Sequence, residues 1–137
     1  MERRHFLQVL GGSIVAQACS SPMAPPVTLK AADVKMNTLT ALSNLKAFVG
    51  RDAGGLYAMS SICKHESCDI ANGGKILVGP PPKLQCGCHG SEYDANGKVI
   101  NPPSTTDLDH VALSVAADGT ISVNTSTVVP PTTRTMG

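Results

Sequence analysis

Two short loops rich in cysteine and histidine constrain this chain more than any other feature. The first reads CKHESC over residues 63–68, and the second reads CGCHGS over residues 86–91. Each loop offers one cysteine and one histidine at the spacing of metal ligands, and each holds one further cysteine. The rest of the chain is therefore expected to support these loops and to bring them together.

The candidate metal ligands are Cys63 and His65 in the first loop and Cys86 and His89 in the second. Two sulfurs and two imidazole nitrogens suit zinc in a closed tetrahedral site. They equally suit an iron–sulfur cluster in which two histidines replace two cysteines on one iron. Spacing alone does not separate these two kinds of site.

The further cysteines, Cys68 and Cys88, bear on that choice. A zinc site with four ligands has no use for them, whereas two exposed loops that hold a cluster gain rigidity from a cross-link. Two buried thiols that stay unlinked are the alternative, because pairing is not proved by sequence. A small zinc-stabilised or disulfide-only exported domain also stays open at this point.

At these residues the chain resembles the Rieske iron–sulfur protein family, whose boxes read C-x-H-x-x-C and C-x-C-H-G-S in cytochrome bc and b6f-type complexes. Both boxes are complete, and the resemblance extends over roughly residues 55–125, through Tyr93-Asp94 to Pro102-Pro103. It implies one [2Fe–2S] cluster as the cofactor. It also implies the ligand set and a disulfide: Cys63 and Cys86 on one iron, His65 and His89 on the other, and Cys68 bonded to Cys88.

The same resemblance gives roles to Ser91 and Tyr93, which follow the second box. In high-potential members the matching serine donates to a bridging sulfide and the matching tyrosine donates to a cysteine sulfur. The low-potential ferredoxins of ring-hydroxylating oxygenases generally lack both, together with the disulfide. Ser91 and Tyr93 are thus predicted to tune the cluster, and a turn residue and a core aromatic are the plainer alternatives.

One pair of residues, Glu66-Ser67, departs from the family pattern. Respiratory members usually have leucine and glycine there, and that leucine lies on the apolar surface that docks at a quinol pocket. A carboxylate in its place would cost desolvation energy on docking. Glu66 is either a solvated loop charge or the mark of a polar protein partner.

Two classes of function follow for this electron-transfer chain. In the first it is an exported carrier, free or lipid-tethered, that works at fairly high potential. In the second it is the iron–sulfur subunit of an oxidoreductase, either a quinol-oxidising bc-type complex or a molybdenum oxidase such as arsenite oxidase. The expected partner is accordingly a redox protein: a cytochrome, a molybdenum oxidase subunit or a quinol-oxidising complex.

Residues 1–18 resemble a twin-arginine export signal, with Arg3-Arg4 before a modestly apolar stretch. A cluster that is inserted in the cytoplasm must be exported inside a folded protein, which is what this route does. Cys19 is a candidate for lipidation, and cleavage after Ala18 is the alternative. Because about 20 apolar residues are needed to span a bilayer, the stretch is too short for an anchor. We expect a periplasmic protein, or one at the outer face of the cytoplasmic membrane that contacts it only through a signal or lipid anchor.

The remaining chain divides by composition and pattern. Residues 19–32 read as a Pro-rich tether, 33–126 as the Rieske domain with its cluster-binding part at about 60–104, and 127–137 as a disordered tail.

Short strands separated by turns are predicted for the domain. Strands are expected at 45–50 and 56–60, and a hairpin across Asp118-Gly119 is expected to join 111–115 to 120–124. The only helix signal is a weak one at 37–43. The predicted class is all-β, and the resemblance implies a Rieske fold: a small antiparallel β-sandwich base with a cluster-binding subdomain that carries the two Cys/His loops. A net charge of +1, two Phe, two Tyr and no Trp argue against nucleic-acid binding.

Overall fold

The computed structural model describes residues 29–64 and 66–137. The predicted export signal, Cys19, most of the predicted tether and the candidate ligand His65 lie outside the described residues.

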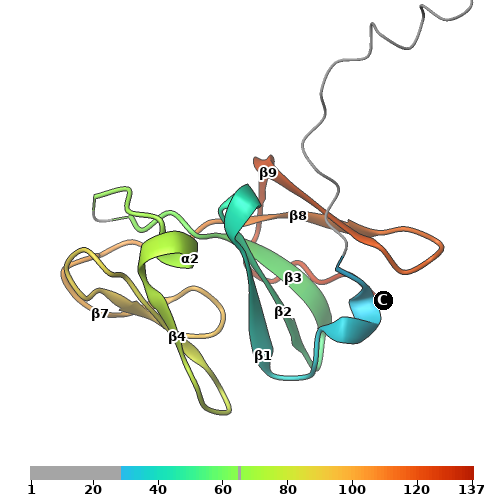
Figure 1. Ribbon diagram of the computed structural model, residues 1–137, viewed down its shortest axis with the longest axis horizontal. Coiled ribbons are helices and arrows are strands. Elements are labelled where there is room, and N and C mark those ends of the chain that lie inside the picture. Colours follow the sequence, from blue (N-terminus) through green and yellow to red (C-terminus); the bar gives the residue numbers. More distant parts are fainter. Residues whose placement is uncertain (1–28, 65) are drawn as a thin grey trace, which may run out of the picture.

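Two antiparallel sheets form the described part of the chain (Figure 1). The base sheet has the order β1-β2-β3-β8-β9, with strands β1 (Thr38–Leu42), β2 (Ala47–Asp52), β3 (Gly55–Ser60), β8 (His110–Val115) and β9 (Ile121–Val129). The loop-bearing sheet has the order β4-β5-β6-β7, with strands β4 (Lys75–Leu77), β5 (Lys83–Gln85), β6 (Glu92–Tyr93) and β7 (Val99–Asn101). The short helices are η3 (Ala31–Asp33), η4 (Ser43–Leu45) and α2 (Ile70–Gly73). The predicted all-β class is confirmed.

The hairpins of the base sheet form where the sequence predicts them. β2 pairs with β3 in continuous register, from Ala47 opposite Ser60 to Asp52 opposite Gly55. β8 and β9 are joined by a turn in which the Gly119 amide donates to the Ala116 carbonyl at 2.8 Å. Gly119 has a φ of 91°, a left-handed conformation that glycine adopts without steric cost.

β1 corrects the weak helix signal at 37–43. This segment is a strand that pairs with β2 along its whole length, with Leu39 opposite Gly50 and Ala41 opposite Phe48. Leu39 is buried in the core, and a Cβ on Gly50 would lie 2.9 Å from the Leu39 side chain. Burial and a complete hydrogen-bond ladder outweigh a weak local preference for helix.

The domain begins earlier than the predicted boundary at residue 33. The Ile121 amide donates to the Leu29 carbonyl at 2.9 Å, and the Ala31 amide donates to the Gly119 carbonyl at 2.8 Å. Ala31 is buried, and its carbonyl accepts from Arg51 Nη2 at 2.8 Å. The last residues of the predicted tether therefore belong to the base sheet, because their backbone groups pair with β9.

The C-terminal residues 127–137, predicted to be disordered, are instead folded onto the base sheet. β9 continues to Val129, and Leu56 and Thr135 exchange two backbone hydrogen bonds of 2.8 Å. Arg134 makes a bidentate ion pair with Asp52, at 2.9 Å from Nε to Oδ1 and 2.7 Å from Nη2 to Oδ2. These partners are remote in sequence, so the local pattern of prolines and threonines did not reveal them.

Two apolar cores lie against the strands of the base sheet. One contains residues that alternate with the other along β2 and β3, with Phe48 and Met59 in the first core and Val49 and Ala58 in the second. The first core also contains Leu84, Cys63, Cys86 and Tyr93, so it joins the base sheet to the loop-bearing sheet. Within the described residues no helix is long and apolar enough to cross a membrane.

Candidate metal centre

The two Cys/His loops connect the base and loop-bearing sheets to the elements that follow them. Loop 1 (residues 63–68) lies between β3 and α2, and loop 2 (residues 86–91) lies between β5 and β6. Both loops close through the same pair of backbone hydrogen bonds. In loop 1, Cys63 N donates to Cys68 O at 2.7 Å and Ser67 N donates to Cys63 O at 2.9 Å. In loop 2, Cys86 N donates to Ser91 O at 2.8 Å and Gly90 N donates to Cys86 O at 3.1 Å.

The fifth residue of each loop turns the backbone in the left-handed region. Ser67 has a φ of 57° and Gly90 a φ of 81°. The turn buries the cysteine that opens each loop, with Cys63 1% and Cys86 2% exposed, and leaves Ser67 and Gly90 at the surface. Each loop therefore directs one thiol inward and its tip toward solvent.

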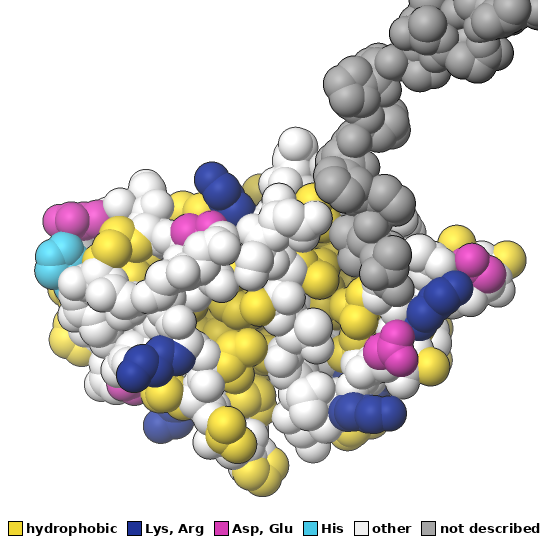
Figure 2. Space-filling model, in the orientation of Figure 1, with side chains coloured by type: hydrophobic (Ala, Val, Ile, Leu, Met, Phe, Trp, Pro, Cys, Tyr) yellow, Lys and Arg dark blue, Asp and Glu magenta, His cyan; other side chains and the backbone are white. Residues whose placement is uncertain are grey.

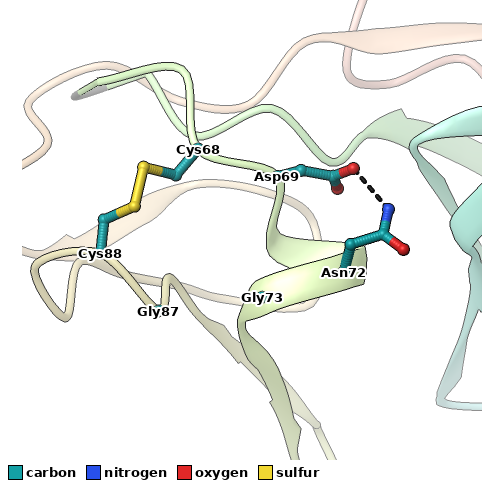
Figure 3. A pocket seen from close by; sticks show the side chains of 6 residues that line it. All are labelled: Cys68, Asp69, Asn72, Gly73, Gly87 and Cys88. Atoms are coloured by element: carbon teal, nitrogen blue, oxygen red, sulfur yellow. Dashed lines mark hydrogen bonds between the residues drawn. A yellow bond between two sulfur atoms is a disulfide. The ribbon is translucent and has the colours of Figure 1, made fainter.

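A disulfide joins the loops, as the family resemblance implied. Cys68 and Cys88 are bonded, with their Cα atoms 6.4 Å apart (Figure 3). The bond lies at one side of a surface pocket whose opposite side is α2; its lining residues are Cys68, Asp69, Asn72, Gly73, Gly87 and Cys88. Asp69 caps α2 by accepting from the Ala71 amide at 3.0 Å.

Glycine allows α2 to pack directly on loop 2. A Cβ on Gly87 would lie 1.8 Å from the Gly73 carbonyl oxygen, and one on Gly74 would lie 2.2 Å from the Gln85 oxygen. No side chain fits between these backbones. This contact and the disulfide together set the separation of the two loops.

The buried thiols of Cys63 and Cys86 are adjacent, and a hydrogen bond between them contributes to the raised pKa of Cys86, after burial, the largest cause. The sulfurs of Cys68, Cys86 and Cys88 lie within 4.8 Å of one another. Because Cys68 and Cys88 are cross-linked, this group is not a three-thiolate zinc site. The thiols of Cys63 and Cys86 are the sulfur ligands that the loops offer.

His89 is exposed at the tip of loop 2. Its Nδ1 atom lies 3.8 Å from Oε1 of Glu66 in loop 1, and the two side chains are 48% and 57% exposed. Figure 2 shows an exposed histidine next to an acidic side chain at the end of the molecule that carries the loops. The surface around His89 is therefore polar and includes a carboxylate.

Tyr93 lies beneath the first cysteine and is fully buried. Its hydroxyl oxygen lies 3.2 Å from Cys63 Sγ, and it accepts from the Lys64 amide at 3.2 Å. Burial raises the pKa of Tyr93, so the hydroxyl keeps its proton. The Lys64 amide occupies the oxygen, and the hydroxyl hydrogen can therefore be donated to the sulfur.

Ser91 is buried at the end of loop 2, and it is 1% exposed. Its Oγ atom accepts from the Ser104 amide at 2.9 Å. This bond occupies a lone pair of the oxygen and leaves the hydroxyl hydrogen of Ser91 for a further acceptor.

The sequence analysis missed two contacts that support the loops. Ser104 holds Ser91 through its backbone amide, and the only sequence signal was its place after Pro102-Pro103. Lys64 Nζ pairs with Asp109 Oδ2 at 2.8 Å and ties loop 1 to the segment before β8. The two residues are 45 positions apart, and no local pattern indicates their pairing.

Comparison with known proteins decides between the alternatives. The family model of the Rieske [2Fe-2S] domain matches residues 23–117. The chain belongs to the Rieske [2Fe-2S] domain family. As a Rieske domain it has one [2Fe–2S] cluster as its cofactor, and it is an electron-transfer protein.

Curated relatives of this Rieske chain are iron–sulfur subunits of the cytochrome b6-f complex. The subunit of Synechococcus sp. (strain WH7803) is 40% identical over 70 residues, which is 50% of this chain and 36% of that protein. The chloroplastic subunit of Chlamydomonas reinhardtii is 32% identical over 71 residues, which is 52% of this chain and 32% of that protein. The chain thus spans about a third of the length of these relatives.

A solved structure shows the same fold. The ferredoxin of carbazole 1,9a-dioxygenase from Nocardioides aromaticivorans IC177 matches 74% of this chain and 97% of its own, with a TM-score of 0.50 and 20% identity. The donor set fits a Rieske cluster, because two buried thiols lie side by side beneath an exposed histidine.

Proposed function

We propose that this chain is an exported Rieske-type carrier that transfers one electron at fairly high potential. Cys63 and Cys86 ligate one iron, and His65 and His89 ligate the other. The observation that supports this proposal most directly is the 3.2 Å contact between the Tyr93 hydroxyl and Cys63 Sγ. A donor at a ligand sulfur is the feature by which high-potential centres differ from low-potential ones.

Hydrogen bonds to the sulfurs raise the potential for an electrostatic reason. The bound cluster supplies reversible one-electron transfer. Tyr93 donates toward Cys63 Sγ, and Ser91 has a hydroxyl hydrogen left to donate. Because a hydrogen bond to a more negative acceptor is stronger, these donors favour the reduced state. Two neutral imidazoles in place of thiolates act in the same direction.

The partner of this carrier is proposed to be a redox protein with a basic surface. His89 is exposed, so the tip of the loops is the point of electron exchange, and Glu66 lies 3.8 Å from it. A carboxylate there attracts cationic side chains and speeds encounter at low salt. Its transfer to an apolar pocket would instead cost desolvation energy.

Export is proposed from the sequence of residues 1–18. Arg3-Arg4 and the apolar stretch after them support a twin-arginine route to the periplasm or to the outer face of the cytoplasmic membrane. Cys19 is the proposed site of a lipid anchor.

The second candidate function is the iron–sulfur subunit of a quinol-oxidising complex of the cytochrome bc type. The similarity to cytochrome b6-f iron–sulfur subunits favours it. A molybdenum oxidase such as arsenite oxidase would use the same electron-transfer domain. The exposed carboxylate of Glu66 favours the carrier over the quinol-oxidising subunit.

The cluster and its tuning are tested on the full chain produced in iron-replete cells. We expect two irons and two sulfides per chain, a low average g value after reduction, and colourless protein for Cys86→Ser. Ser91→Ala and Tyr93→Phe should each lower the midpoint potential by some tens of millivolts, up to ~100 mV, from the energy of a hydrogen bond to a charged acceptor. Stoichiometric zinc without iron, or wild-type midpoints in both variants, would contradict the proposal.

The choice of partner is tested by the charge of Glu66. Glu66→Gln should slow electron transfer to a basic c-type cytochrome at low ionic strength, and high salt should remove the difference. Asp118→Asn is the matched control, since this exposed carboxylate lies in the β8–β9 turn outside the loops. A faster reaction of Glu66→Leu with a quinol-oxidising complex, without any effect of Glu66→Gln on the cytochrome, would favour the subunit.

A further inference from the structure

The turn between β6 and β7 carries Tyr93 at its entrance. Asp94 follows Tyr93 directly, and its Oδ1 accepts from the amides of Asn96 at 2.8 Å and Lys98 at 3.0 Å. Gly97 completes the turn with a φ of 82° and donates to the Asp94 carbonyl at 2.9 Å. The turn is rigid within itself, so a shift of the turn is transmitted to Tyr93.

Side chains of the base sheet hold this turn from outside. Tyr57 in β3 donates its hydroxyl to the Ala95 carbonyl at 2.7 Å. His110 in β8 has Nε2 at 2.8 Å from the Asn96 carbonyl, and because a carbonyl only accepts, Nε2 is the donor. The Tyr57 and His110 rings are stacked with their centroids 5.6 Å apart. Neighbouring carbonyls of the turn are thus bound by two stacked rings.

Arg134 connects these contacts. Its Nη2 donates to the Asn96 side-chain oxygen at 2.8 Å, and its guanidinium lies 4.3 Å from the centre of the Tyr57 ring. The same guanidinium makes the bidentate pair with Asp52 in β2, which lowers the pKa of that carboxyl. The Arg134 side chain is only 17% exposed. One guanidinium therefore contacts β2, the ring that holds Ala95, and the turn itself.

Nothing in the comparisons assigns a role to this contact, because the matched Rieske domain ends at residue 117. We propose that Arg134 is a positioning residue for the cluster site: it holds the turn at 94–97 and thereby keeps the Tyr93 hydroxyl at Cys63 Sγ. This inference rests on the proposed function, in which Tyr93 tunes the cluster. It adds the C-terminal segment to the residues that set the potential.

The geometry of the guanidinium explains why arginine is required. Its planar fork binds both oxygens of Asp52 while Nη2 still reaches Asn96, and its flat face lies over the Tyr57 ring. Lysine keeps the positive charge but offers a single nitrogen, without a fork or a flat face. Arg134→Lys therefore releases the turn and leaves the long-range field of the charge in place.

The test is a double-mutant cycle on the intact holoprotein, with the midpoint potential as the readout. Arg134→Lys should lower the midpoint, by less than Tyr93→Phe does. In the Tyr93→Phe background Arg134→Lys should cause no further shift, because the hydroxyl it positions is gone. Thr135→Val is the matched control: Thr135 Oγ1 bonds the Leu113 carbonyl and not the turn, so the midpoint should stay at the wild-type value.

A second readout follows the turn directly. Amide hydrogen exchange at Asn96 and Lys98 should be faster in Arg134→Lys than in wild type and unchanged in Thr135→Val. Asn96→Ala removes the other end of the bond and should shift the midpoint in the same direction, which keeps the test open if Arg134→Lys does not assemble.

The outcomes separate this inference from the proposed function. If Tyr93→Phe itself leaves the midpoint unchanged, the tuning role of Tyr93 is wrong, and the inference falls with it. If Tyr93→Phe lowers the midpoint but Arg134→Lys and Asn96→Ala do not, only the positioning role is wrong. An equal shift from Arg134→Lys in both backgrounds would show an effect independent of Tyr93 and would also overturn it.

Discussion

Loop 1 and loop 2 close with the same backbone hydrogen bonds and differ in the side chains at two positions. At the fifth position loop 1 has Ser67, whereas loop 2 has Gly90, and both are left-handed. At the sixth position loop 1 has Cys68, which forms the disulfide, whereas loop 2 has Ser91, which accepts from Ser104. The shared backbone presents one thiol from each loop, and the last position is free for different tasks.

The comparison teaches that cross-linking and tuning are divided between the loops. Loop 1 supplies one half of the disulfide from its final residue, and loop 2 supplies the other half from Cys88 in its middle. Loop 2 can therefore use its final residue, Ser91, for a hydrogen bond. Loop 1 receives its donor from outside, since Tyr93 comes from β6.

The largest expected effect concerns the cross-link that both loops share. Replacing Cys68 and Cys88 together by serine should lower the free energy of unfolding by about 3 kcal/mol, because the disulfide closes a loop of 20 residues' separation in the unfolded chain. Urea denaturation measures this change. Wild-type protein reduced with dithiothreitol should behave as the double variant does, and an unchanged urea midpoint would contradict the prediction.

A smaller effect is expected where loop 2 meets α2. Gly87→Ala should lower the free energy of unfolding by about 1–3 kcal/mol, the usual range for overpacking, because its Cβ would overlap the Gly73 carbonyl oxygen. Urea denaturation again provides the measurement, and Gly90→Ala in the same loop is the control, since a Cβ there meets nothing within 4 Å. If Gly87→Ala were no more destabilising than Gly90→Ala, direct packing of the backbones would not set the loop separation.

The smallest effects should have opposite signs at the fifth positions. Gly90→Ala should destabilise by about 1 kcal/mol, because an L-residue in the left-handed region carries a steric cost. Ser67→Gly should stabilise by about 0.5–1 kcal/mol, because it removes that cost while adding chain entropy to the unfolded state. Matched thermal unfolding scans compare the two. The same sign in both variants would mean that the loops do not share this conformation.

The predictions from sequence succeeded where the signal was local. The turn at Asp118-Gly119 and the strands on either side of it were predicted because alternation and a glycine turn occur within a few residues. The end of the domain was wrong because Arg134 and Thr135 are ordered by partners in β2 and β3. The weak helix at 37–43 was wrong because pairing with β2 is non-local.

The sequence by itself determined the family, the class of cofactor and the pair of cysteines that form the disulfide, since ligand chemistry depends on residue type and spacing within each loop. Only the tertiary structure decided how the loops are held: the approach of Gly87 to Gly73, the support of Ser91 by Ser104, and the tail that places Arg134 beside Asn96. These contacts join segments that are distant along the chain. They form because burying the shared apolar core brings the two sheets together, and local sequence patterns carry no record of which polar groups then meet.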